Sequence, residues 1–163
     1  MSLCGKMEAD IEMKAPAEKV FEFYTCLAYQ MSKSSPEMLH SVDLQEGRWG
    51  QKGSVLCWNY LIDGKVEKIK MMTEEIDDRN KSATYKTIEG ELLKFYKTFK
   101  FILQVTPREE GSLVHWSFEF EKMNANIPNP ESTLPAVVHA CKDIDVHLTQ
   151  QPNAQRSPRL QCY

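Results

Sequence analysis

The stretch from Met38 to Met123 most constrains the fold, because it contains one strand-like segment after another and no convincing helix. Residues 113–122 show the pattern most clearly, since aromatic and branched residues alternate there with His, Ser and Glu. Such alternation is typical of a strand with one buried face. Together with a first strand at 6–13, the segments predict an antiparallel sheet. The other predicted strands lie at 40–47, 54–62, 65–77, 82–91 and 95–105.

Helical patterns flank this run of strands. Residues from Pro16 to about Met31 predict one helix or two short ones, and Pro16 is tolerated in a first turn. From Ser132 to Gln150 the apolar residues recur with a helical period, and Ser132 is a candidate N-cap. The tail, residues 151–163, has little apolar content and is predicted to be disordered. We therefore expect a single α+β domain over residues 1–150, whose last helix covers the apolar face of the sheet.

Length, charge and cysteine content exclude several function classes. The 163 residues carry a net charge of −3 and no dense basic block, which argues against a nucleic-acid partner. No run approaches the ~20 apolar residues of a membrane helix, so no stable membrane association is expected. The five scattered cysteines form no CxxC pair, which predicts reduced thiols and no zinc site. The first ten residues have no signal-peptide pattern, and the predicted compartment is the cytoplasm.

Four stretches resemble the major latex protein branch of the Bet v I superfamily, which includes the class-ten pathogenesis-related proteins of plants. They read "LCGKMEADIEM", "VDLQEGRWGQKGSVLCWNYLIDGK", "TYKTIEGELLKFYKTF" and "CKDIDVHL", and they follow in the right order from about residue 3 to 150. The resemblance implies a helix-grip fold, in which a curved seven-stranded antiparallel sheet wraps round a long C-terminal helix. It also implies two short helices after the first strand, a large apolar cavity for small hydrophobic molecules, and a link to plant defence and stress responses.

The segment "EGRWGQKGS" at 46–54 has the composition of a phosphate-binding loop. A true phosphate loop leads from a strand into a helix and ends in Lys followed by Ser or Thr. Here Gly53 separates Lys52 from Ser54, and a strand follows. We predict a tight connection whose glycines supply positive φ angles, with a tryptophan packed over it. The residues of this glycine-rich loop are Gly47, Trp49, Gly50 and Gly53.

Strand alternation and the resemblance together assign one set of side chains to the interior. These rings and apolar groups either fill the core or line a ligand pocket that holds a few polar groups. The predicted cavity residues are Tyr24, Leu56, Trp58, Tyr60, Ile69, Met71, Ala83, Tyr85, Phe99, Phe101, Trp116, Phe118, Leu134, Val138, Cys141 and Asp145.

Asp145 is the most informative member of this set, because it falls on the inward stripe of the last helix. A charge there costs free energy unless it is paired or near water. It either meets Tyr85 or another hydroxyl across the cavity, or lies at the cavity mouth. Alternatively, it lies at the edge of the stripe and extends into solvent.

Three other polar residues of this helix, His139, Asp143 and His147, recur at four-residue spacing. That spacing suits a metal-binding face, but the residues lie opposite the apolar stripe, where a solvated face is favoured. We expect no metal and no cofactor.

Two hypotheses for function remain. The first is a non-catalytic carrier of small hydrophobic molecules such as lipids, steroid-like compounds, hormones or secondary metabolites, acting as a monomer or weak dimer. The second is an enzyme that condenses or isomerises a small plant metabolite in the same cavity, with Asp145 or Tyr85 as acid or base. Lys97 is the one lysine with a possible inward position.

Overall fold

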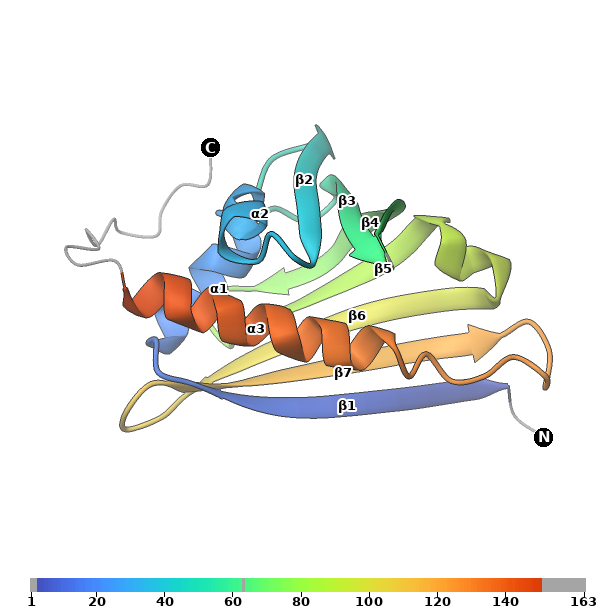
Figure 1. Ribbon diagram of the computed structural model, residues 1–163. Helices are drawn as coiled ribbons and strands as arrows, with labels where there is room; N and C mark the ends of the chain where they lie inside the picture. The colour runs from blue at the N-terminus through green and yellow to red at the C-terminus, as the bar shows by residue number, and fades with distance from the viewer. Residues whose placement is uncertain (1–2, 63, 151–163) are drawn as a thin grey trace.

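The computed structural model describes residues 3–62 and 64–150 (Figure 1). The predicted tail at 151–163 lies outside the described residues. Short helices follow the first strand as expected, and a 3₁₀ helix at Glu91–Lys94 was not predicted. In chain order the elements are β1 (Cys4–Met13), α1 (Ala17–Thr25), η1 (Ala28–Gln30), α2 (Met31–Ser34), β2 (Leu39–Glu46), β3 (Val55–Ile62), β4 (Lys65–Asp77), β5 (Ser82–Gly90), η2 (Glu91–Lys94), β6 (Tyr96–Pro107), β7 (Ser112–Lys122) and α3 (Thr133–Thr149).

The seven strands form one antiparallel sheet in the order β1-β7-β6-β5-β4-β3-β2. Strands that follow one another from β2 to β7 are neighbours in the sheet, and β1 pairs with β7 at one edge. The sheet curves, and α3 runs along its concave side (Figure 1). This arrangement confirms the predicted helix-grip fold and places the inward side chains of the strands opposite α3.

The inner face of β6 and β7 is filled by phenylalanine rings. Phe99 pairs with Phe120 and Phe101 with Phe118 across the two strands. The first pair is stacked with centroids 5.8 Å apart, and the second is edge-to-face at 4.9 Å. A Cβ atom on Gly5 would lie 2.5 Å from the Phe120 ring, so the glycine allows this ring to lie across β1. These contacts make a tightly packed wall.

The cysteines only partly follow the expectation of reduced thiols. Cys57 and Cys141 are free, whereas Cys26 is disulfide-bonded, which corrects the expectation at that position. Within the described part of the chain, no helix is long and apolar enough to cross a membrane.

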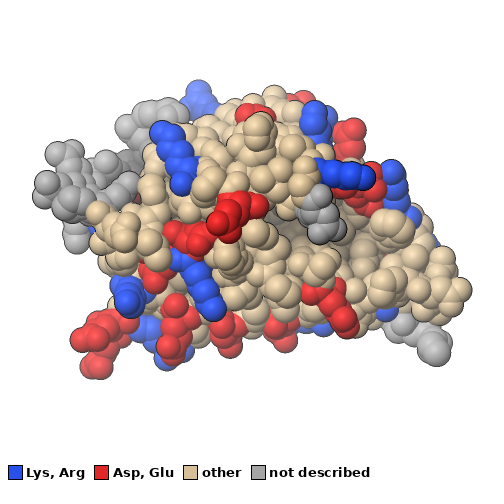
Figure 2. Space-filling view, in the orientation of Figure 1, with Lys and Arg blue, Asp and Glu red and all other residues tan. Residues whose placement is uncertain are grey.

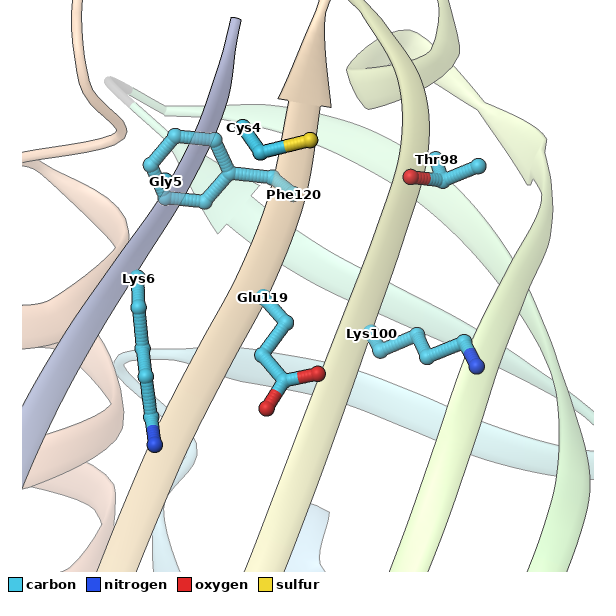
Figure 3. Close-up of a pocket in the computed structure, with 7 residues that line it drawn as sticks. All are labelled: Cys4, Gly5, Lys6, Thr98, Lys100, Glu119 and Phe120. Carbon is cyan, nitrogen blue, oxygen red and sulfur yellow. The ribbon is translucent and has the colours of Figure 1, made fainter. Parts of the chain in front are cut away.

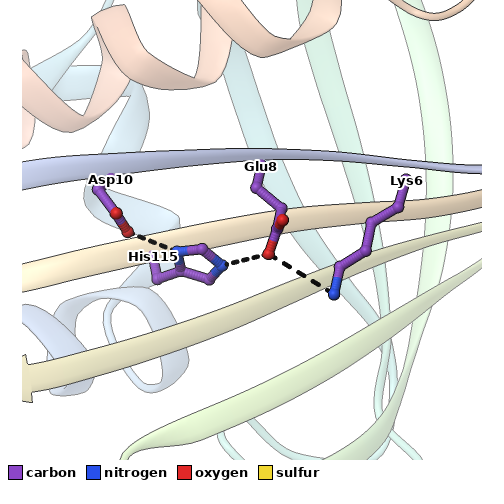
Figure 4. Close-up of polar contacts among 4 residues, drawn as sticks. All are labelled: Lys6, Glu8, Asp10 and His115. Atoms are coloured by element: carbon purple, nitrogen blue, oxygen red, sulfur yellow. Dashed lines mark hydrogen bonds and ion pairs between the residues drawn. The ribbon is translucent and has the colours of Figure 1, made fainter.

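A charged cluster lies on the outer face, where β1 pairs with β7 (Figure 4). His115 Nδ1 lies 2.5 Å from Asp10 Oδ1, and its Nε2 lies 3.0 Å from Glu8 Oε1. Lys6 Nζ lies 3.5 Å from the same Glu8 oxygen. The hydrogen bond with Asp10 raises the pKa of His115 above its usual value, aided by Glu8 and opposed by partial burial.

We expect His115 to stabilise the fold most at acidic pH. Its folded-state pKa is raised, so its contribution is fully present below the unfolded-state pKa of about 6.5 and is lost as pH rises through the folded-state pKa. Urea unfolding of the native protein and of His115→Gln, from about pH 5.5 to about pH 8.5, measures this contribution. The stability difference between them should shrink as pH rises. A difference that stays constant or grows would contradict the assignment.

Candidate functional site

The concave face of the sheet and α3 enclose the candidate site. The closest neighbours of α3 are β1, α2 and α1, and β1 is an edge strand of the sheet order. The middle strands are not among these close neighbours. Figure 2 shows that this side of the molecule is hollowed between α3 and the end of the β3–β4 hairpin. The helix therefore closes against one edge of the sheet and stands off from its middle.

Four of the predicted cavity residues have almost no accessible surface. Phe99, Phe118 and Cys141 are fully buried, and Ala83 is 1% exposed. Ala83 lies opposite Leu103, which is also fully buried. Neighbouring side chains cover these four residues in this structure, and their assignment to a cavity stays a prediction.

Other inward residues keep accessible surface even though they face the interior. Trp58 and Tyr60 on β3 and Leu134 and Val138 on α3 are only half-buried. Apolar groups that face the interior without burying one another leave room for a further apolar body. Exposed fractions of 4–7% remain on Tyr24, Ile69, Met71, Tyr85, Phe101 and Trp116.

Leu56 is buried and pairs with Met71 on β4, but it is not part of the main core cluster.

Sequence patterns also missed residues that pack at the border of this region. Leu92 and Ile127 are half-buried against the core although they lie in η2 and in the β7–α3 connection. Their one signal is an apolar residue outside any periodic pattern, which is weak evidence for burial.

The interior contains a small polar group formed by α1, α3 and β7. The Tyr24 hydroxyl lies 2.8 Å from Cys141 Sγ, and the rings of Tyr24 and Trp116 meet edge-to-face at 5.4 Å. Burial, followed by the adjacent Cys141, raises the pKa of Tyr24 well above its usual value. Burial also raises the pKa of Cys141 to about 11. Both groups therefore remain protonated and uncharged at neutral pH.

Asp145 lies at the junction of β1 and α1. Its carboxylate accepts hydrogen bonds from the backbone N–H of Lys14, at 3.0 and 2.9 Å, and from that of Ala15, at 2.9 Å. The carboxylate therefore meets backbone donors, and its place among the cavity residues stays a prediction. Both oxygens hold α3 against the chain segment that leaves β1, which is a structural role.

The glycine-rich loop is a tight connection, as predicted. Gly47, Gly50 and Gly53 have φ angles of 79°, 74° and 89°, and the Trp49 ring packs against Tyr29 with centroids 5.4 Å apart. The backbone N–H groups of Gln51, Gly53 and Ser54 donate to backbone carbonyls. Because these donors are already used, this loop does not present them as a phosphate cradle.

The polar face of α3 is occupied by protein contacts. Asp143 accepts a 2.7 Å hydrogen bond from the Ser35 hydroxyl and lies 3.3 Å from His139 Nε2. His147 packs against the Phe23 ring at 5.6 Å. Among residues 3–62 and 64–150, no group of three or more His, Cys, Asp or Glu side chains is arranged to hold a metal ion.

A shallow pocket on the outer face of β1, β7 and β6 is separate from the interior (Figure 3). Its lysines are already paired, Lys6 with Glu8 and Lys100 with Glu74 at 2.8 Å. Lys97, the possible inward lysine, is exposed and lies 3.7 Å from Glu121. The expectation of an inward lysine is therefore wrong.

Comparison with known proteins agrees with this geometry. The sequence model of the pathogenesis-related protein Bet v 1 family matches residues 2–151. This chain belongs to the Bet v 1 family. It is 41% identical to MLP-like protein 43 of Arabidopsis thaliana over 149 residues, which is 90% of this chain and 94% of that protein. MLP-like protein 31 of the same plant is 40% identical over 152 residues, 92% of this chain and 89% of that protein. These relatives place the chain in the major latex protein branch of the family.

Solved structures of the Bet v 1 family show the same fold. Ginseng major latex-like protein 151 from Panax ginseng superposes with a TM-score of 0.86 at 32% identity, over 92% of this chain and 99% of that chain. Norcoclaurine synthase from Thalictrum flavum has a TM-score of 0.73 at 15% identity, over 92% of this chain and 89% of that chain. At that identity the likeness concerns the fold alone. The chain thus has the ligand-binding fold of its family.

Proposed function

We propose that this protein is a non-catalytic carrier that binds small hydrophobic molecules between the concave face of the sheet and α3. The observation that carries the proposal is the set of inward aromatic and apolar side chains that keep accessible surface, with Trp58, Tyr60 and Val138 as its half-buried members. Covering such surface with an apolar ligand is favourable by about 25 cal/mol per Å².

The enzyme hypothesis loses most of its candidate groups. Asp145 is held by backbone N–H groups, and Lys97 is exposed on the outer part of the molecule. Tyr85 then remains as the candidate of that hypothesis, and acid–base work needs a positioned proton donor or acceptor with a suitable pKa. This distribution supports binding over catalysis.

The remaining elements of the proposal come from the family resemblance and from surface charge. The resemblance ties carriers of this kind to plant defence and stress responses. Acidic and basic side chains are interspersed on the face shown in Figure 2, and the net charge is −3. That distribution supports a protein without a nucleic-acid partner. The cytoplasmic location and the monomeric or weakly dimeric state are part of the proposal.

The test is titration of the native protein with N-phenyl-1-naphthylamine, a neutral fluorescent probe. We expect saturable binding with a dissociation constant in the micromolar range, because burial of fused rings gains several kcal/mol, less the cost of immobilising the probe. Tryptophan emission should change in parallel, since Trp58 and Trp116 face the site. Absence of saturable binding by the folded protein would contradict a carrier role.

A further inference from the structure

The polar groups of the interior are mainly hydrogen-bond donors. Trp116 is 6% exposed, and its indole N–H lies close enough to Tyr24 and Cys141 to influence their pKa values but makes no hydrogen bond of normal geometry. Tyr24 and Cys141 share one 2.8 Å contact, in which either atom can be the donor. An indole nitrogen is a donor only, whereas a hydroxyl and a thiol each carry one hydrogen. These three side chains thus have three hydrogens and one hydrogen bond among them, which leaves a surplus of donors.

A second indole repeats this pattern on β3. Trp58 lies opposite Ile69 on the inner face, and its Nε1 is also buried without a hydrogen-bond partner. A buried donor without an acceptor costs about 1–3 kcal/mol, and most such groups in native proteins find a partner. Two unpartnered indole donors on one inner face are therefore a specific feature of this interior.

The interior carries no charge that would attract an ion. None of the described Lys, Arg, His, Asp or Glu residues is buried. Raised pKa values keep Tyr24 and Cys141 neutral. A charged ligand group would have to leave water without a counter-ion, which is costly, whereas a neutral acceptor would satisfy the donors.

We propose that the group formed by Tyr24, Cys141 and Trp116 selects neutral hydrophobic ligands that carry a hydrogen-bond-accepting oxygen, such as a ketone or ester carbonyl. The Trp116 N–H donates to that oxygen while the surrounding rings cover the apolar body of the ligand. The inference rests on the proposed carrier function and adds the chemical class of the ligand.

The test compares 2-acetylnaphthalene with 2-ethylnaphthalene, which have nearly the same shape and differ in the carbonyl. Each compound displaces N-phenyl-1-naphthylamine from the native protein and from Trp116→Phe, which keeps an aromatic ring but lacks the N–H. The ratio of the two apparent affinities should favour the ketone about 3- to 10-fold more in the native protein than in the variant, as one net hydrogen bond predicts. Because the ketone preference of the native protein is compared with that of the variant, the intrinsic difference in hydrophobicity between the two compounds cancels.

Trp49→Phe is the matched control, because Trp49 packs on Tyr29 in the glycine-rich loop and should leave the ratio unchanged. If Trp116→Phe does not fold, the carbonyl stretch of 2-acetylnaphthalene bound to the native protein, compared with that in an apolar solvent, tests the same hydrogen bond. The carbonyl stretch of bound 2-acetylnaphthalene should shift to lower wavenumber in the native protein relative to the variant.

The outcomes separate the two proposals. If the native protein binds neither compound nor the probe, the carrier function itself fails and this inference fails with it. If both compounds bind and the affinity ratio is the same in the native protein and the variant, the carrier function stands and the donor group does not select its ligand.

Discussion

Replacing Asp145 by alanine is expected to lower the free energy of unfolding by about 2 to 3 kcal/mol, because a carboxylate that accepts backbone hydrogen bonds contributes more than a neutral acceptor. Its two oxygens accept from the N–H groups of Lys14 and Ala15. Lys14 is exposed, so water replaces part of its lost bond, whereas Ala15 is 1% exposed. The Ala15 N–H therefore loses its acceptor without full replacement.

Urea unfolding with a constant transition slope measures this loss. Asp145→Asn, which keeps one acceptor oxygen, should fall between the native protein and the alanine variant. Val146→Ala is the control on the next residue, since Val146 is exposed and its truncation should change stability by roughly 0.5 kcal/mol or less. If Asp145→Ala keeps native-like stability but loses probe binding, then Asp145 contributes to ligand binding and its structural role is contradicted.

Filling the interior with Val138→Trp is expected to weaken binding of N-phenyl-1-naphthylamine at least about 10-fold while the protein remains folded. Val138 is half-buried on the inward side of α3. A larger ring there occupies the accessible space that the probe needs, and it buries apolar surface instead of displacing packed atoms. Probe titration and thermal melting of the same preparation measure the two effects.

Two matched tryptophan substitutions show whether this effect is specific. Val146→Trp places the same ring on the exposed face of α3 and should leave binding unchanged. Ala83→Trp should destabilise the fold by about 1–3 kcal/mol or more, because Ala83 is covered by Ile76 and Leu103 on the neighbouring strands. Undiminished binding to Val138→Trp, or a loss of stability as large as that of Ala83→Trp, would mean that the interior is filled.

The strands could be predicted because their signal is local. The side chains of a strand alternate between two faces, so a segment such as 113–122 reveals its buried face without reference to any other. The glycine-rich loop could be interpreted for the same reason, since the order of Lys52, Gly53 and Ser54 excludes a phosphate loop within nine residues.

The contacts of Asp145 could not be predicted, for the opposite reason. A helical wheel reports which side of α3 a residue occupies, and Asp145 does lie beside the buried residues Ile144 and Leu148. It cannot report which backbone groups the carboxylate meets, because Lys14 is 131 positions away along the chain. Lys97 was misjudged at the irregularity between Tyr96 and Thr98, where a shift in register changes the face that alternation predicts.

The sequence by itself determined the succession of strands and helices along the chain and the α+β class, because alternation and helical period act within about ten residues. Only the tertiary structure decided which inward residues are packed and which keep accessible surface. Phe118 and Trp116 are two positions apart on the same face of β7, yet one is fully buried and the other keeps an unpartnered N–H. That difference depends on how far α3 stands from each part of the curved sheet, which no local pattern of residues encodes.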